Sequence, residues 1–90
     1  MSQGLQIIVK GRVQGVYFRV YTQKQAVKRN LSGFVRNLPD SSVEIVATGD
    51  AADLQKLVDW CQKGPILAKV SEVIVSPYHA GEHFEGFEIR

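Results

Sequence analysis

The residues most suggestive of chemistry form the stretch GRVQGVYFR, residues 11–19. Its glycine spacing matches neither Gly-x-Gly-x-x-Gly nor Gly-x-x-x-x-Gly-Lys-Ser/Thr, so a nucleotide site is not supported. A tight turn from Gln14 to Phe18 would present backbone N–H groups at the start of a helix, where an anion is favoured. Arg19, in the first helical turn, could bind two phosphate oxygens at once. Together these features indicate a phosphate-binding site. Considered alone, Gly15 could be an ordinary turn glycine and Arg19 a solvated helix residue.

Asn37, near the end of the segment GFVRNLPD, is the second candidate. Side chains alternate along a strand, so Asn37 shares a face with Val35, and the opposite face carries Phe34, Arg36 and Leu38. Asparagine is depleted in strands, which makes its amide unusual at this position. The alternative interpretation is that Asn37 only ends the strand and starts the turn at Pro39.

Other reactive side chains form weaker candidates. His79 and His83 flank Glu82, but nearby glycines argue against a helix, and two histidines without a cysteine or a third ligand make a poor metal site. We therefore interpret them as loop residues. Cys61 falls on the apolar face of a predicted helix, where a cysteine is more often a small core residue than a nucleophile.

The first half of the chain supplies the elements that would position Arg19 and Asn37. Alternation predicts a strand over residues 5–13 with one apolar face, and a helix follows over residues 18–30. Asn30 suits the left-handed residue that ends a helix. The buried face of this helix is left open between two stripes, which are Val20, Val27 and Leu31 or Phe18, Thr22 and Ala26.

In the second half of the chain, turn and helix-cap residues mark the ends of the elements more clearly. The segment PDSS, residues 39–42, turns a strand over residues 32–38 into a second strand over residues 43–49. Asp50 is a good N-cap for a second helix, which stops before Gly64-Pro65. The buried face of that helix is Leu54, Leu57, Val58 and Cys61, with Trp60 as a partly exposed packing residue. Strands are expected over residues 68–76 and 83–90.

This order of elements predicts an α+β fold of the ferredoxin-like split βαβ type, because two helices can bury their apolar stripes together only on one face of the sheet. The sheet would have four to five mostly antiparallel strands. Right-handed crossovers would bring the end of the first strand, the start of the first helix and the second strand together. Such a fold does not specify function.

Composition favours a single domain over residues 1–90, with 44% hydrophobic and 22% charged residues and a mean hydropathy of −0.09. One cysteine and no long apolar run suit a cytoplasmic protein that does not enter a membrane. Charge is uneven: residues 1–39 carry seven basic and no acidic residues, and residues 40–90 carry four basic and nine acidic ones. The two parts could neutralise each other in the fold, or the basic part could line the opening of a binding site that attracts an anion.

Two motifs together carry a family resemblance. Residues 11–19 match the pattern Gly-x-Val-x-Gly-Val-x-Phe-Arg, and residues 33–37 match Gly-aromatic-Val-x-Asn. Either motif alone is weak, but in this order and at this separation they are specific. With KGP at residues 63–65 and the closing FEGFEIR, the chain resembles an acylphosphatase along essentially its whole length.

The resemblance implies hydrolysis of the carboxyl-phosphate bond of acyl phosphates without a metal or cofactor. It implies that Arg19 clamps the phosphate and that Asn37 positions the attacking water. The phosphate would be bound by the backbone amides of a loop formed by Gln14, Gly15, Val16, Tyr17, Phe18 and Arg19. A monomer is expected, with inorganic phosphate as product and competitive inhibitor.

The chain departs from the family pattern at positions that concern packing and turn geometry. Phe34 stands where tryptophan is commoner, Arg29 where an apolar residue is commoner, and Asp40-Ser41 where Asp-Gly is usual. Neither of the two functional side chains is affected.

Three other functions are less well supported by the sequence. An RNA-binding module shares the order of elements, but its aromatic motif belongs on the third strand, and VEIVATG has no aromatic residue. Tyr17, Phe18 and Tyr21 are accordingly expected to be buried for packing rather than to stack on bases. A metal chaperone of this fold needs paired cysteines, and a relative that binds anions without hydrolysing them stays open.

Overall fold

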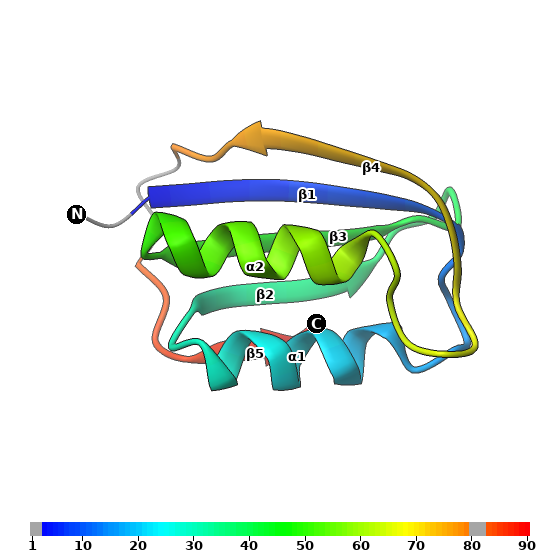
Figure 1. Ribbon diagram of the computed structural model, residues 1–90, viewed down its shortest axis with the longest axis horizontal. Coiled ribbons are helices and arrows are strands. Elements are labelled where there is room, and N and C mark those ends of the chain that lie inside the picture. Colours follow the sequence, from blue (N-terminus) through cyan, green and yellow to red (C-terminus); the bar gives the residue numbers. More distant parts are fainter. Residues whose placement is uncertain (1–2, 80–82) are drawn as a thin grey trace.

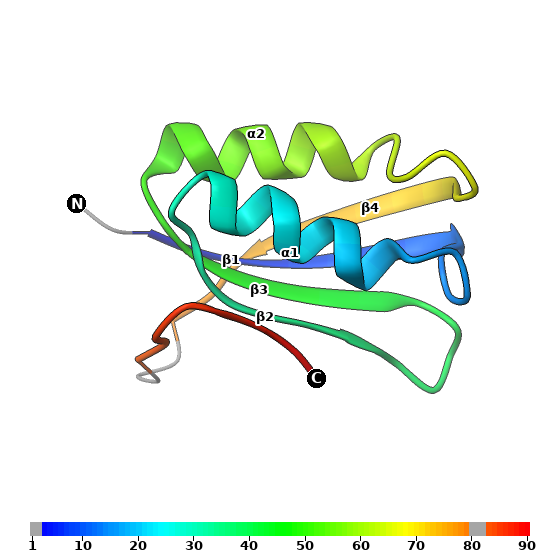
Figure 2. The same cartoon turned by 90° about the horizontal axis from the view of Figure 1, so that it is seen from below.

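The computed structural model describes residues 3–79 and 83–90 as two helices and five strands. In chain order they are β1 (Gln3–Arg12), α1 (Phe18–Lys28), β2 (Ser32–Asn37), β3 (Val43–Gly49), α2 (Ala51–Cys61), β4 (Lys69–Pro77) and β5 (Phe87–Ile89). Both helices lie on one face of the sheet (Figures 1 and 2). The predicted ferredoxin-like α+β architecture is confirmed.

The sheet has the order β4-β1-β3-β2-β5. Neighbouring strands are antiparallel except β2 and β5, which run parallel. β1 and β2 therefore point the same way on either side of β3. The end of β1, the start of α1 and the end of β2 consequently meet at one end of the molecule, as predicted (Figure 1).

The buried face of α1 is the stripe of Phe18, Thr22 and Ala26, which settles the choice between the two predicted stripes. Thr22 is fully buried, and its hydroxyl donates to the carbonyl of Phe18 at 2.7 Å, so a polar side chain is accommodated in the core. Val20 and Val27 are exposed. α1 ends at Lys28, two residues earlier than expected, and Asn30 has the predicted left-handed conformation, with φ 58°.

The prediction that Tyr17, Phe18 and Tyr21 are buried is wrong for the two tyrosines. Phe18 is buried, but Tyr17 and Tyr21 are 67% and 45% exposed. A helix turns by about 100° per residue. Tyr21 lies about 100° round the helix from Thr22, the middle of the buried stripe, so it flanks the surface that faces the core. Tyr17 precedes the helix.

α2 forms as predicted. The carboxylate of Asp50 accepts a hydrogen bond from the amide of Ala52 at 3.0 Å, which satisfies one of the free donors at the helix start. The buried face is Leu54, Leu57, Val58 and Cys61. Trp60 is half-buried and packs on Phe18, with ring centroids 5.3 Å apart. The two helices are thus joined by a contact at the first residue of α1.

The strand boundaries differ from the predictions at several ends. β1 ends at Arg12 and β2 at Asn37, each one residue early, and β4 is displaced by one residue. The strand expected over residues 83–90 is only Phe87–Ile89. Phe84 instead packs on Phe34 and Val46 in a small cluster on the face of the sheet away from the helices. None of the described helices is long and apolar enough to cross a membrane.

The β2–β3 turn keeps a left-handed residue although it lacks the usual glycine. Ser41 has φ 77°, a conformation that costs a non-glycine residue about 1–2 kcal/mol. The turn is held by the side chain of Asp40, which accepts from both the amide and the hydroxyl of Ser42. These hydrogen bonds compensate for the strained residue and keep the hairpin rigid next to Asn37.

Candidate active site

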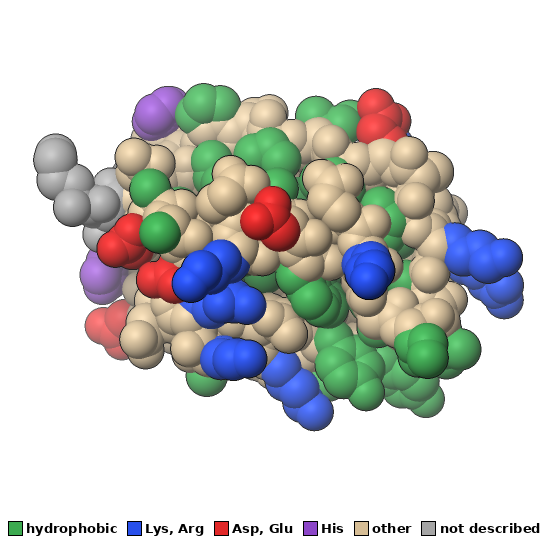
Figure 3. All heavy atoms as spheres, viewed as in Figure 1, with side chains coloured by type: hydrophobic (Ala, Val, Ile, Leu, Met, Phe, Trp, Pro, Cys, Tyr) green, Lys and Arg blue, Asp and Glu red, His purple; other side chains and the backbone are tan. Residues whose placement is uncertain are grey.

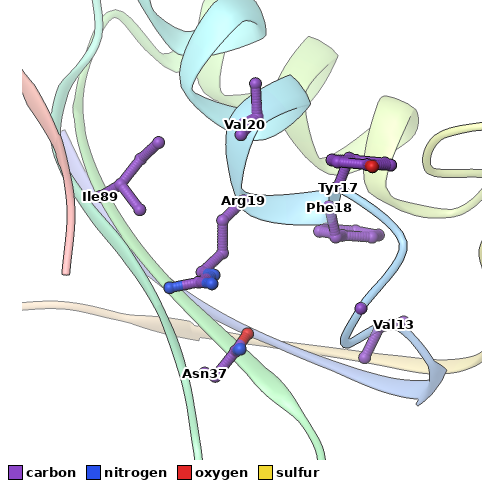
Figure 4. Close-up of a pocket in the computed structure, with 8 residues that line it drawn as sticks. Val13, Tyr17, Phe18, Arg19, Val20, Asn37 and Ile89 are labelled. Carbon is purple, nitrogen blue, oxygen red and sulfur yellow. The ribbon is translucent and has the colours of Figure 1, made fainter.

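A cavity of about 280 Å³ opens where β1 passes into α1 and β2 ends. Its walls are Val13, Gly15, Tyr17, Phe18, Arg19, Val20, Asn37 and Ile89. The polar groups in this set are the guanidinium of Arg19, the carboxamide of Asn37 and the phenol hydroxyl of Tyr17. Figure 4 shows the guanidinium of Arg19 and the carboxamide of Asn37 pointing toward one another from α1 and β2. The cavity therefore combines polar groups from α1 and β2 with apolar side chains.

The loop before α1 has the backbone of an anion-binding turn. Gly15 has φ 74° and Tyr17 has φ 63° and ψ 22°, so two residues of this short loop are left-handed. A Cβ atom on Gly15 would meet nothing within 4 Å, so glycine is favoured there for its conformation and not for lack of space. Left-handed residues in a tight turn can direct successive N–H groups into one concavity.

The N–H groups of this loop are free of internal partners. Among the described residues, no backbone hydrogen bond has its donor at residues 15–19. The N-cap, Tyr17, provides no side-chain cap, and the first turn of α1 contains no acidic residue. The partial positive charge at the start of α1 is therefore not compensated by the protein's own side chains, which favours an external anion.

Arg19 is half-buried in the first turn of α1. Its Nη1 lies 3.4 Å from the main-chain oxygen of Arg90, at the end of β5, to which it donates. This long contact directs the guanidinium across the cavity and leaves other N–H donors of the fork for a ligand. Four residues further along, Gln23 donates to the carbonyl of Phe87 at 2.8 Å. α1 and β5 are therefore held together next to Arg19.

Asn37 is the last residue of β2 and is half-buried. The predicted alternation is confirmed by its neighbours, because Val35 belongs to the core under the helices and Phe34 to the cluster on the opposite face. Asn37 follows Val35 onto the helix side and so reaches the cavity.

The structure separates the predicted loop residues into two groups. Gly15, Tyr17, Phe18 and Arg19 line the cavity together with Asn37. The side chain of Val16 is buried in the core, and that of Gln14 donates to two carbonyls of the β2–β3 turn. These two residues can offer a ligand their backbone amides, whereas their side chains are engaged elsewhere.

The apolar walls Val13, Val20 and Ile89 were not among the predicted site residues. Val20 could have been suspected, since it adjoins Arg19 in the sequence. Ile89 could not, because it reaches the cavity only through the parallel pairing of β5 with β2, opposite Val35. No local pattern in FEGFEIR specifies that neighbour.

The remaining candidate groups lie outside the cavity. Burial raises the pKa of Cys61 to about 12, so this thiol stays protonated and unreactive at neutral pH. His79 and His83 are exposed loop residues, and Glu82 lies outside the described residues. Within residues 3–79 and 83–90, no three side chains of the metal-binding types are grouped closely enough to hold an ion.

The uneven charge of the sequence is partly neutralised within the fold, and the predicted basic opening for an anion stays a prediction. Arg36, from the basic segment, pairs with Glu44 from the acidic one on the open face of the sheet. On the helix side, however, α1 carries Arg19, Lys24 and Lys28 and no acidic residue. Figure 3 shows basic side chains at the lower left, where the end of α1 lies in Figure 1, and hydrophobic side chains at the lower right, where α1 begins.

Comparison with known proteins gives a consistent result. The model of the family described as Acylphosphatase matches residues 5–89. The chain is 45% identical over 90 residues to an acylphosphatase of Actinobacillus pleuropneumoniae, covering 100% of this chain and 99% of the relative. It is also 45% identical to an acylphosphatase of Rubrobacter xylanophilus, covering 99% of this chain and 81% of the relative. The crystal structure of the acylphosphatase from Bacillus subtilis superposes with a TM-score of 0.93 at 40% identity, covering 100% and 99% of the two chains.

Proposed function

The chain belongs to the acylphosphatase family, and on that premise we propose that it hydrolyses the carboxyl-phosphate bond of acyl phosphates by in-line attack of a water molecule. The observation that carries this proposal is the cavity shared by Arg19 and Asn37 at the uncapped start of α1. One side of the cavity suits a phosphoryl group, and the other can hold its nucleophile.

The phosphoryl group would bind at the loop of residues 14–19. In phosphoryl transfer, charge is spread over the equatorial oxygens, and stabilising that charge is the main task of the protein. The free N–H groups at the start of α1 and the guanidinium of Arg19 are donors of the required kind. Because the loop is already left-handed at Gly15 and Tyr17, little reorganisation would be needed on binding.

Asn37 would hold the water. Its carboxamide oxygen can accept a hydrogen bond from a water molecule and direct the water oxygen at phosphorus, opposite the leaving carboxylate. The bond between water and phosphorus forms as the bond from phosphorus to the carboxylate oxygen breaks. The proton of the water passes to a phosphoryl oxygen of the substrate. The products are a carboxylate and inorganic phosphate.

This chemistry requires no protein nucleophile. A carboxylate is a stable leaving group, so neither a strong general acid nor a covalent intermediate is needed. The proposed site consists of amides, one guanidinium and one carboxamide, and we propose that it works without a metal ion. Residues 1–90 would act as one domain and a monomer, with inorganic phosphate binding competitively.

The acyl group would lie against the apolar wall of the cavity. Tyr17, Val20 and Ile89 line the side away from Asn37 and are 67%, 40% and 39% exposed, so they can lose further apolar surface to a ligand. An aromatic acyl phosphate fits that description better than a small one does.

Hydrolysis of benzoyl phosphate by the purified protein tests the proposal. We expect turnover of benzoyl phosphate, little turnover of p-nitrophenyl phosphate, competitive inhibition by phosphate and no effect of EDTA. Phosphate binding without hydrolysis would support the non-catalytic alternative. Loss of activity in EDTA, restored by a divalent ion, would contradict the metal-free mechanism.

A further inference from the structure

Gln14 makes two hydrogen bonds that the anion-binding role of its loop does not explain. Its side-chain Nε2 donates to the carbonyl of Leu38 at 2.9 Å and to the carbonyl of Ser42 at 2.8 Å. Both donors of the carboxamide are thereby used, and they join the loop before α1 to the β2–β3 turn.

The two acceptors lie in a turn that has its own internal hydrogen bonds. The turn closes on itself, because Leu38 donates to the carbonyl of Ser42 and Ser41 donates to the carbonyl of Leu38. Asp40 holds the amide and hydroxyl of Ser42 in addition. Gln14 is therefore attached to a hydrogen-bonded support, the β2–β3 turn.

This support also carries Asn37, which immediately precedes Leu38 and is paired with Val43, the residue after Ser42. The loop that Gln14 begins carries the free N–H groups and leads into Arg19. The two hydrogen bonds of Gln14 therefore link the loop before α1 directly to the turn next to Asn37. These two parts of the proposed site are otherwise joined through the sheet and the core.

We propose that Gln14 is a positioning residue that fixes the distance between the phosphate-binding loop, residues 14–19, and Asn37. The inference rests on the proposed function. In-line attack requires the water and phosphorus to be aligned closely, and a misplacement of about 1 Å can cost about 100-fold in rate. Without the two hydrogen bonds the loop would still bind phosphate, since its amides and Arg19 are contiguous in the chain. The bound phosphate would no longer be held opposite the water.

Gln14→Met provides the test, because methionine has a similar length and no N–H donors. The carbonyls of Leu38 and Ser42 would each keep their partner within the turn, so a large loss of stability is not expected. Gln55→Met is the matched control, since Gln55 donates to Asp59 on the exposed side of α2. Gln14→Asn, whose shorter carboxamide cannot span both carbonyls, is a second variant should Gln14→Met fold poorly.

The measurement is a double-mutant cycle with Asn37→Ala on the hydrolysis of benzoyl phosphate. We expect Gln14→Met to lower kcat about 10- to 100-fold and to leave the inhibition constant of phosphate within a few-fold. The variant carrying both substitutions should be no slower than Asn37→Ala alone, since there is then no oriented water to misalign. Gln55→Met should match the parent.

Two results would overturn the inference and leave the proposed function intact. One is a loss of kcat from Gln14→Met that multiplies with that from Asn37→Ala, since the two residues would then act independently. The other is a rise in the phosphate inhibition constant as large as the loss of kcat, which would indicate a collapsed loop. Parental kcat in Asn37→Ala would instead contradict the proposed role of Asn37 in the mechanism, and the inference with it.

Discussion

Gly64 lies against the ring of Phe18, so closely that a Cβ atom on Gly64 would be 2.6 Å from Cε2 of Phe18. The ring cannot move aside freely, because it is buried and packs on Trp60. Gly64 also has a left-handed backbone, with φ 68°. The segment after α2 thus packs on Phe18, the first residue of α1, which belongs to the proposed phosphate-binding loop.

Gly64→Ala should therefore destabilise the protein by more than its backbone conformation alone explains. Gly86→Ala is the matched control, because Gly86 has φ 77° and its Cβ would meet nothing within 4 Å. We expect about 1–2 kcal/mol of strain in both variants, and about 1–3 kcal/mol more in Gly64→Ala from overpacking. Urea unfolding measures both values. Equal losses in the two variants would contradict the steric role of Phe18.

Arg19→Lys keeps the positive charge and removes the planar fork. We expect kcat for benzoyl phosphate to fall and the inhibition constant of phosphate to rise, because an ammonium cannot hold two oxygens in the same geometry. Circular dichroism should be unchanged, since the side chain is only half-buried. If the lysine variant hydrolyses acyl phosphates as well as the parent, Arg19 is not the clamp.

Ile89→Ala tests the apolar wall of the cavity. Its side chain lines the cavity and is 39% exposed, so the truncation removes contact surface for an acyl group. We expect KM for benzoyl phosphate to rise several-fold more than KM for acetyl phosphate, with phosphate inhibition unchanged. Val27→Ala removes an exposed apolar side chain of α1 outside this cavity and should alter neither constant. An equal rise in KM for both substrates would rule out a role in acyl recognition.

Asp40→Asn should change the response of stability to acid. Hydrogen bonds from the hydroxyl and amide of Ser42 lower the pKa of Asp40 from its ordinary value of 3.8. The ionised form therefore stabilises the folded state at pH values above 3.8, and that contribution is lost as the pH falls through the lowered pKa. Between about pH 6 and about pH 2, the urea midpoint of the variant should fall less steeply than that of the parent. Parallel curves would contradict this assignment.

Much of this architecture was predictable because its signals are local. The cap at Asp50 and the apolar spacing from Leu54 to Cys61 specify α2 within a dozen residues. The motifs around Arg19 and Asn37 place those two residues at the ends of neighbouring elements, and the crossover rule brings the ends together.

The unpredicted features depend on contacts between distant segments. The exposure of Tyr21 follows from which stripe of α1 meets the core, and the two stripes are similar in the sequence. Ile89 reaches the cavity through a parallel pairing with β2, and Gln14 reaches the turn at Leu38 through its side chain. Neither contact leaves a periodic or compositional signal.

Asn37→Ala is the most direct test of the account, through kcat, the phosphate inhibition constant and the thermal midpoint of the same variant. If Asn37 orients the water, phosphate should still bind at the loop and Arg19, so its inhibition constant should stay within a few-fold. Turnover should fall by about 10² to 10³, the usual loss for one preorganised polar contact to a transition state. A lowered midpoint with parental kcat would show that Asn37 serves only the end of the strand, and would contradict the proposed mechanism.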